Sequence, residues 1–405
     1  MLGAWRFVTV FGTISLLADF VYEGARSITG PLLASLGATG LVVGVVTGIG
    51  EAAALGLRLV SGPLTDRTKR FWAWTIAGYT LTIVTVPVLG IAATLWVACA
   101  LVIAERIGKA VRSPAKDTLL SHAAAVTGRG RGFAVHEALD QIGAVIGPLT
   151  VAAVLALTDN DYGPALGILA LPGAAALALL VWLRLRVPDP ARYEPQLPDT
   201  THPKAGLTGE HRTRPDSLPT AFWMYCAFTS TTMIGFATFG VLSFHMVARG
   251  VLPAAAVPLV YAAAMAADAA AALMSGWLYD RIGAKTLAAL PILSALIPLL
   301  AFSDQVWPVI AGALLWGAAV GIQESTLRAV VADLVAPPRR ATAYGVFAAG
   351  LGAATAAGGA LTGWLYDTSI PALVITVATI QIAAVGLATT MIIGRQRTRL
   401  DQTEP

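Results

Sequence analysis

Ionisable side chains recur inside apolar stretches of this sequence, at spacings that place them on shared helix faces. Asp19, Glu23 and Arg26 stand at i, i+4 and i+7, and because one residue turns an α-helix by about 100° they form one polar stripe. A second stripe holds Glu105, Lys109, Arg112 and Lys116. Ionisable groups at bilayer depth cost about 3 kcal/mol or more unless they face water or a partner. The two stripes therefore predict a water-lined cavity or an internal ion-pair network.

A carboxylate in a partly dry cavity can load and release a proton, so Asp19 and Glu23 are the first candidates for proton coupling. The helical rise puts Asp19 close to the middle of its apolar segment. His136 and Asp140, at i and i+4 in FAVHEALDQIGAVIGPL, are further candidates. The alternative is an ion-pair network with a purely structural role, which applies most to Glu105, Arg106, Arg112, Glu137 and Arg328.

Candidates for lining a substrate cavity come from both parts of the chain. They are Arg26, Glu51, Arg58, Glu105, Lys109, Arg112, Thr231, Phe236, Gln323, Glu324 and Arg328. Most of the ionisable groups lie in the first part, which we expect to carry ion coupling. The second part would supply a more apolar wall, with aromatic candidates that could equally be packing residues: Phe228, Phe236, Phe239, Tyr261, Trp316 and Phe347. Such a cavity suits an amphipathic organic molecule.

The composition is that of a protein with many membrane spans. Hydrophobic residues make up 56% of the 405 residues and charged residues only 12%, and the mean hydropathy is +0.72. Windows long enough to cross about 30 Å of hydrocarbon as helix fall at 7–35, 40–61, 72–93, 95–115, 132–156, 163–185, 220–247, 254–275, 286–302, 306–332, 341–362 and 370–393. The sequence therefore predicts an all-α membrane protein with twelve transmembrane helices in two six-helix bundles.

Basic residues in the connectors set the expected orientation. Nineteen arginines and lysines fall in connectors and termini on one side of the predicted membrane, whereas the opposite connectors carry Arg249 alone. Because cytoplasmic loops are enriched in basic residues, we expect both termini in the cytoplasm. The predicted domains are an N-terminal bundle at 1–188, a polar cytoplasmic linker at 189–219, a C-terminal bundle at 220–394 and a cytoplasmic tail at 395–405.

One motif appears twice, in SGPLTDRTKR at Ser61–Arg70 and in SGWLYDRIGAK at Ser275–Lys285. The two copies of Gly-x-x-x-Asp-Arg are 214 residues apart, about half the chain, which predicts two related halves. We expect the glycines to permit a tight connector and each aspartate to cap the helix that follows. The residues concerned are Gly62, Asp66, Arg67, Arg70, Gly276, Asp280, Arg281 and Gly283.

Together with the span count, the half-repeat and the central linker, this motif resembles the loop signature of the major facilitator superfamily. The first copy departs from that signature at Lys69, where a second glycine is expected, and the second copy at Ala284, where a basic residue is expected. The resemblance covers essentially the whole chain. It implies two bundles that rock about a central site to give alternating access. It also implies that Asp66, and by extension Asp280, acts as a latch on the cytoplasmic side.

A glycine stripe continues the polar face of the fifth apolar segment. Gly143, Gly147 and Pro148 are similar to the fifth-helix motif of exporters in this superfamily, although Leu149 and Thr150 stand where Gly-Gly usually follows. The same spacing is common where two helices merely pack closely, so both interpretations stay open. A third fragment, TGWLYDTSI, repeats the glycine and aspartate on the outer side, and we interpret it as a helix end.

These observations favour proton-coupled export of a small amphipathic organic compound, driven by a proton or other ion gradient and without a cofactor. The alternatives are an importer or uniporter that binds an organic anion through Arg26, Lys109 and Arg112, and a lipid-moving protein or receptor on the same scaffold. The sequence contains no catalytic constellation, metal-ligand spacing or nucleotide-binding loop, and its basic residues follow the membrane surface instead of forming a nucleic-acid site. We expect a non-enzymatic monomer in a bacterial-type inner membrane.

Overall fold

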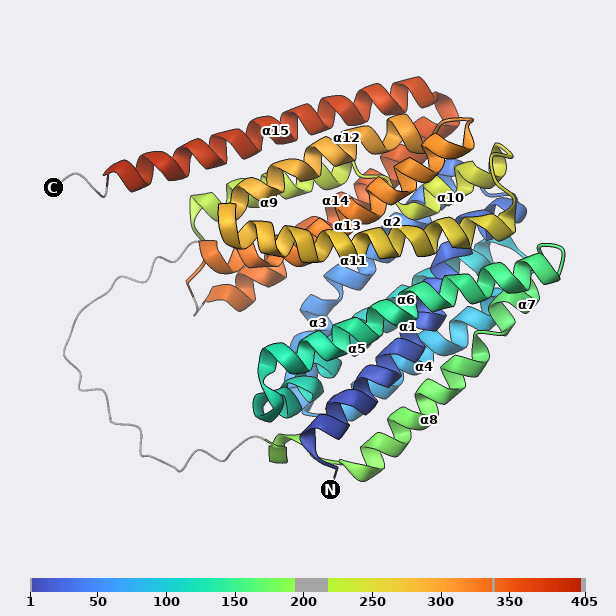
Figure 1. The fold of residues 1–405 in the computed structure, drawn as a ribbon, viewed down its shortest axis with the longest axis vertical. Coiled ribbons are helices and arrows are strands. Elements are labelled where there is room, and N and C mark those ends of the chain that lie inside the picture. Colours follow the sequence, from blue (N-terminus) through green and yellow to red (C-terminus); the bar gives the residue numbers. More distant parts are fainter. Residues whose placement is uncertain (1, 194–217, 337–338, 402–405) are drawn as a thin grey trace.

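Two helical bundles lie side by side and splay apart at one end of the molecule (Figure 1). The computed structural model describes residues 2–193, 218–336 and 339–401. Among these residues every regular element is a helix. One apolar core is shared by both bundles, and a second belongs to the first bundle alone. The predicted all-α, two-bundle architecture is confirmed.

Six rods form the first bundle, two of them broken within the rod. Its helices are α1 (Ala4–Ser35), α2 (Gly40–Gly56), α3 (Arg58–Thr68), α4 (Phe71–Leu89), α5 (Leu95–Thr127), α6 (Arg129–Leu157), α7 (Tyr162–Gly167) and α8 (Ala170–Arg186), followed by the 3-10 turn η1 (Pro190–Tyr193). α2 is separated from α3 by Leu57 alone, and α7 from α8 by Ile168 and Leu169; all three residues keep dihedral angles of the right-handed helical region.

The second bundle repeats this plan. It contains α9 (Thr220–Ile234), α10 (Phe239–Ala248), η2 (Ala254–Ala256), α11 (Val257–Ile282), η3 (Gly283–Ala288), α12 (Ala289–Ala301), α13 (Val306–Leu334), α14 (Arg340–Thr368) and α15 (Ile370–Asp401). α9 and α10 are halves of one rod that is unwound at Gly235–Thr238. Broken membrane helices commonly border binding sites, and this break lies beside the cavity described below.

In the described part of the chain, ten rods are long and apolar enough to cross a membrane. Two further rods, α5 and the one that ends with α12, are not among these ten, and each has a reason for this. α5 carries the charged stripe between residues 105 and 116, which lowers its hydropathy, and the rod that ends with α12 is shorter, at Lys285–Ala301. Successive helices in each bundle run in alternating directions, and both of these rods take their turn in that alternation. The arrangement is therefore that of twelve spans.

The two ends of the bundles differ in charge. The basic end holds both ends of the described chain, Leu2 and Asp401, and the connectors at 69–70, 128, 187–192, 283–288 and 335–336. The opposite end holds the connectors at 36–39, 90–94, 158–161, 249–256, 302–305 and 369. Most of the predicted linker lies outside the described residues. α15 runs through the boundary expected at residue 394 and ends at Asp401, and residues 402–405 lie outside the description.

Glycines allow helices of the two bundles to touch backbone to backbone at the opposite end. A Cβ atom added to Gly44 of α2 would lie 2.1 Å from the Gly359 carbonyl oxygen of α14, and one added to Gly30 of α1 would lie 2.2 Å from the Gly240 oxygen of α10. Within the first bundle, Gly143 and Gly147 of α6 meet the backbone of α1 in the same way. Any larger residue would force these helices apart.

The expected capping role of the repeated motif is wrong in this structure. Asp66 lies inside α3 and Asp280 inside α11, so neither carboxylate precedes the next helix. α4 begins after Arg70 without a side-chain cap. The expected role of the glycines is also wrong, because Gly62 and Gly276 lie inside α3 and α11 and not in the connectors. A Cβ on Gly276 would meet nothing within 4 Å, and one on Gly62 would only reach Pro114 at 4.0 Å. The helices simply extend further than the apolar windows.

Candidate functional site

A cavity of about 700 Å³ lies between the two bundles and opens toward the basic end. Exposed Asp66 and Leu59 line its mouth, and Arg26, Glu51 and Trp316 line its depth. Six of the predicted cavity residues line it: Arg26, Glu51, Arg58, Phe236, Gln323 and Glu324. The aromatic wall that was expected from the second bundle includes Trp316 and Phe347 as well as Tyr344.

Arg26 is the basic group at the depth of the cavity, and acidic partners already surround it. Its guanidinium donates to a Glu51 carboxylate oxygen at 2.8 Å and lies 3.6 Å from Glu23. Arg106 lies 3.2 Å from the same Glu51 oxygen. Arg26 also lies over the ring of Trp316, with 5.7 Å between its central carbon and the ring centroid. The Arg26 charge is therefore balanced within the protein.

Glu23 connects the two bundles. It is 7% exposed, and it accepts a short hydrogen bond from the phenol of Tyr261 on α11. A second polar contact between the bundles joins the hydroxyls of Thr47 and Thr238 at 2.8 Å. A change in the charge of Glu23 would act directly on a bond between the halves, because hydrogen bonds to a charged acceptor are stronger than those to a neutral one.

The charged side chains of α5 face the interior of the first bundle. Arg106 and Lys109 lie over the ring of Tyr22, at 4.6 and 4.1 Å, and Arg106 lies 3.3 Å from Glu105. Further toward the basic end, Arg112 lies 3.6 Å from Asp19 and 4.4 Å from the ring centroid of Tyr79. Among the described residues, Glu105, Lys109 and Arg112 are not in the cavity lining. The stripe is an internal ion-pair and cation–π network.

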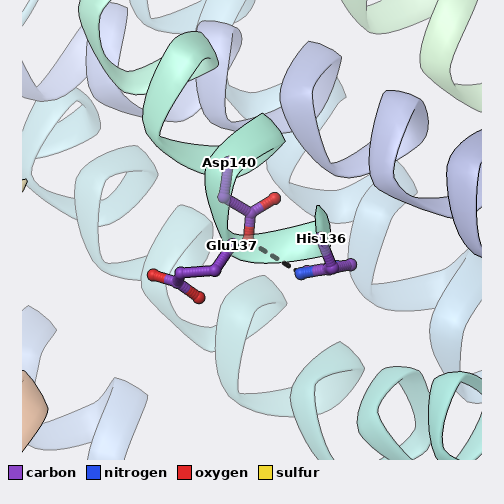
Figure 2. Close-up of side chains that lie close together, drawn as sticks. All are labelled: His136, Glu137 and Asp140. Atoms are coloured by element: carbon purple, nitrogen blue, oxygen red, sulfur yellow. Dashed lines mark ion pairs between the residues drawn. The ribbon is translucent and has the colours of Figure 1, made fainter. Parts of the chain in front are cut away.

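His136, Glu137 and Asp140 lie together on one turn of α6 (Figure 2). The His136 ring points toward Asp140, and their nearest nitrogen and oxygen are 3.5 Å apart, whereas Glu137 extends away from that pair (Figure 2). The other ring nitrogen of His136 lies 2.8 Å from the Ser15 hydroxyl, which also bonds Tyr79 at 3.1 Å. The histidine is thus fixed between two helices of the first bundle.

These three side chains could hold a metal ion, since their potential ligand atoms lie within 4.8 Å of one another. The charges around them favour a different arrangement. The Lys116 ammonium lies 3.7 Å from the Asp140 carboxylate and supplies a positive charge where a metal ion would otherwise do so. His136 and Asp140 therefore fit best into the same polar network that continues to Asp19 and Glu23.

Of the remaining predicted residues, Gly62 of the repeated motif also lines the cavity, and the others that the structure describes do not. Among the described residues, Thr231 is not in the lining, and its neighbours Thr229 and Thr232 donate to carbonyls of their own helix. The Arg328 side chain lies outside the described part of the structure. Arg67, Arg70 and Asp280 are exposed at the basic end with Gly283 nearby, and Arg281 lies over the Trp277 ring at 3.7 Å.

Sequence reasoning missed the roles of two side chains. Tyr261 was expected only as a wall aromatic, yet its hydroxyl bonds Glu23 across the bundle interface. Asp367 was interpreted as a helix end, yet its carboxylate accepts hydrogen bonds from the amides of Gly40 and Leu41 on the other bundle. The signal that could have identified Asp367 is its position in a third copy of Gly-x-x-x-Asp, at Gly363–Asp367.

Comparison with known sequences gives one family and several relatives. The profile of the Major Facilitator Superfamily matches residues 13–285 and 250–404. Uncharacterized proteins of Mycobacterium tuberculosis and Mycobacterium bovis are 74% identical over 383 residues, which cover 95% of this chain and 92% of each relative. An uncharacterized MFS-type transporter of Methanocaldococcus jannaschii is 25% identical over 184 residues, 45% of this chain and 46% of that protein.

Solved transporters share the fold. The peptide transporter POT in complex with sulfate has a TM-score of 0.75 at 14% identity, with 97% of this chain and 94% of that chain covered. The nucleoside transporter NupG has a TM-score of 0.69 at 14% identity, with 95% and 99% covered. At these identities the likeness concerns the fold and carries no information on substrate.

Proposed function

The chain belongs to the major facilitator superfamily and is a secondary transporter embedded in a membrane, and from that premise we propose that it exports small amphipathic organic cations in exchange for protons. The observation that carries this proposal is the position of Glu23. Its carboxylate lies beside the cavity residue Arg26 and bonds Tyr261 of the other bundle. One titratable group therefore borders both the cavity and the contact that must change when the bundles rock.

A cation is favoured over an anion by the charges of the described cavity lining. The lining contains three carboxylates, those of Glu51, Asp66 and Glu324, against the two guanidinium groups of Arg26 and Arg58. Asp66 and Glu324 are exposed, whereas Arg58 is only partly so. Arg26 is occupied by two carboxylates, and two of the arginine and lysine groups expected to bind an anion lie outside the lining. The aromatic rings of Trp316, Phe347 and Tyr344 offer surfaces on which an organic cation is stabilised by about 0.5–2 kcal/mol.

Proton exchange follows from competition for the acidic groups. When the substrate cation binds near Glu51 and Arg26, the ion pairs that hold Glu23 are rearranged, and its proton is released. The same rearrangement weakens the bond of Glu23 to Tyr261, so that the bundles can separate at the opposite end. There the cation leaves, and Glu23 takes up the proton that it carries back to the basic end. Asp19, Asp140 and His136 extend this polar network toward the basic end and provide a route for the proton.

Export is the proposed direction because of the α6 glycine motif. Gly143 and Gly147 lie against the backbone of α1 next to the segment that carries Asp19 and Glu23, so the exporter-like motif adjoins the acidic stripe. The basic end is assigned to the cytoplasm by the excess of arginine and lysine there. A monomer is sufficient for this mechanism, because the cavity and the polar network belong to one chain.

Purified protein in proteoliposomes tests the proposal with ethidium and tetraphenylphosphonium as cation probes and benzoate as an anion probe. Vesicles with an acidic lumen should accumulate the cations against their gradient, because protons leave as cations enter. Accumulation that requires an acidic exterior, or accumulation of benzoate alone, would contradict antiport of cations. Absence of driven movement for all the probes would count against the proposed substrate class.

Matched variants separate coupling from general damage. Glu23→Gln keeps the shape of the side chain and should abolish accumulation while downhill movement of ethidium continues. Asp117→Asn removes an exposed acid of α5 and should behave as wild type. Unchanged accumulation in Glu23→Gln would remove this carboxylate from the mechanism.

A further inference from the structure

The first two amides of α2 are capped by a side chain from the other bundle. The two carboxylate oxygens of Asp367, near the end of α14, accept from the amides of Gly40 and Leu41 at 2.8 Å each. Thr39, the residue before α2, accepts from the next amide, that of Val42, at 3.3 Å. The free amides at a helix start need acceptors, and a carboxylate there also faces the positive end of the helix dipole.

A second contact between the bundles repeats this arrangement. Asn160, in the connector after α6, accepts from the amide of Ala255 at 3.0 Å. Ala255 belongs to the turn η2 that leads into α11, and it lies 214 residues after Leu41, the same interval that separates Gly62 from Gly276. Each half therefore receives, at the start of its second span, a polar side chain from the end of the other half's fifth span.

The capped helices are in closest contact at this same end. Glycine pairs align α2 with α14: Gly40 lies against Gly363, and Gly44 against Gly359. Toward the basic end the contact between α2 and α14 becomes looser, because a Cβ on Gly48 would lie 3.1 Å from the Thr355 oxygen and one on Gly352 would lie 3.2 Å from Ala52. Opening of the opposite end must separate α2 from α14, and this would break both hydrogen bonds to Asp367.

We propose that Asp367 and Asn160 are paired positioning residues that hold the opposite end closed while the cavity is open at the basic end. Asp367 ends the Gly-x-x-x-Asp sequence Gly363–Asp367, just as Asp66 ends Gly62–Asp66. The two aspartates lie at opposite ends of the antiparallel pair that the α2–α3 rod forms with α14. The two aspartates would thus stabilise opposite states of one transporter. The inference rests on alternation between two open ends, and it does not depend on the proposed substrate or coupling ion.

Distances between spin labels in the full-length protein without substrate or gradient test this inference. One label pair occupies the opposite end, at Ile91→Cys and Trp307→Cys, where both native side chains are 78% exposed and belong to different bundles. Another pair occupies the basic end, at Leu185→Cys and Ile282→Cys, which are 74% and 47% exposed. Both native cysteines, Cys99 and Cys226, are replaced by alanine in this background.

Asp367→Ala should lower the ratio of short to long distances at the opposite end by about tenfold, because two charge-assisted hydrogen bonds are lost from the closed state only. The basic-end distances should shorten in the same variant. Asn160→Ala should give a smaller change of about threefold, because a single neutral bond is lost. Asp367→Glu should restore much of the short population.

Asp304→Ala is the matched control, because this exposed acid of the opposite end pairs with Arg249 of its own bundle at 3.4 Å. Its distance distributions should equal those of wild type. Distributions in Asp367→Ala and Asn160→Ala that also equal those of wild type would overturn the inference. So would an equal shift in all three variants, which would indicate a general effect of surface substitutions. If Asp367→Ala does not fold, the distance distribution of Asn160→Ala, whose substitution lies in a connector, decides between these outcomes.

Discussion

Replacement of Gly44 by alanine would add a methyl group where α2 and α14 touch backbone to backbone. The new Cβ would lie 2.1 Å from the Gly359 carbonyl oxygen. Carbon and oxygen do not approach that closely, so the helices must separate by about 1 Å or distort, at a cost of about 1–3 kcal/mol. Only the state that is closed at the opposite end bears this cost. The ratio of closed to open should therefore fall about 5- to 150-fold.

Access to the cavity from the opposite end measures this shift. Val320 of α13 lines the cavity, and in a Val320→Cys background the labelling rate by a membrane-impermeant maleimide in intact cells should rise by the same factor in Gly44→Ala. The helix-forming advantage of alanine over glycine, about 1 kcal/mol, is common to both states and cancels in the ratio.

Two further variants make this prediction specific. Gly276→Ala should leave labelling unchanged, because a Cβ there meets nothing within 4 Å. Gly359→Ala adds its Cβ at 2.3 Å from the Gly44 oxygen and should act like Gly44→Ala. The double variant should show less than the combined effect of the two, since one separation relieves both contacts. Equal labelling rates in Gly44→Ala and Gly276→Ala would show that the contact between Gly44 and Gly359 does not hold the opposite end closed.

Three other predictions concern coupling, orientation and the chain start. Tyr261→Phe removes the hydrogen bond between the bundles and should reduce proton-driven ethidium accumulation by about tenfold, with downhill exchange as the control. An impermeant maleimide should label Asp304→Cys in intact cells and Lys69→Cys only after permeabilisation; the reverse would invert the topology. Burial raises the pKa of the Tyr193 phenol, which donates to the Leu2 carbonyl at 2.7 Å. The neutral form of the phenol is thus favoured in the folded protein. This stabilisation is present below about pH 10 and is lost as the pH rises through the higher folded-state pKa. The unfolding midpoints of wild type and Tyr193→Phe should therefore converge when the pH exceeds the folded-state pKa.

The sequence was sufficient for the architecture because the signals were long and repeated. Twelve apolar windows, the charge bias of the connectors and the doubled motif each act over many residues. Individual cavity residues such as Arg26 and Glu324 could also be predicted, since a charge inside an apolar window needs water or a partner. Spacing on one helix shows which residues share a face, as for Asp19, Glu23 and Arg26.

Contacts between helices could not be obtained in this way. Spacing along α5 puts Lys109 and Arg112 on one face, but only the packed structure shows that this face meets Tyr22 and Tyr79 instead of the cavity. The bond from Tyr261 to Glu23 joins residues 238 positions apart. The motif aspartates were misplaced for a related reason: apolar windows end before the helices do, so Asp66 lies inside α3.

In the proposed mechanism, the charge of Glu23 decides which end of the transporter is open. The spin-label distance between Ile91→Cys and Trp307→Cys, measured in lipid nanodiscs at about pH 5 and about pH 8, tests this mechanism, because protonation removes the charge of a carboxylate. Wild type should redistribute between short and long distances when the pH is changed, whereas Glu23→Gln should give one distribution at both pH values. The same pH response in Glu23→Gln as in wild type would contradict this mechanism.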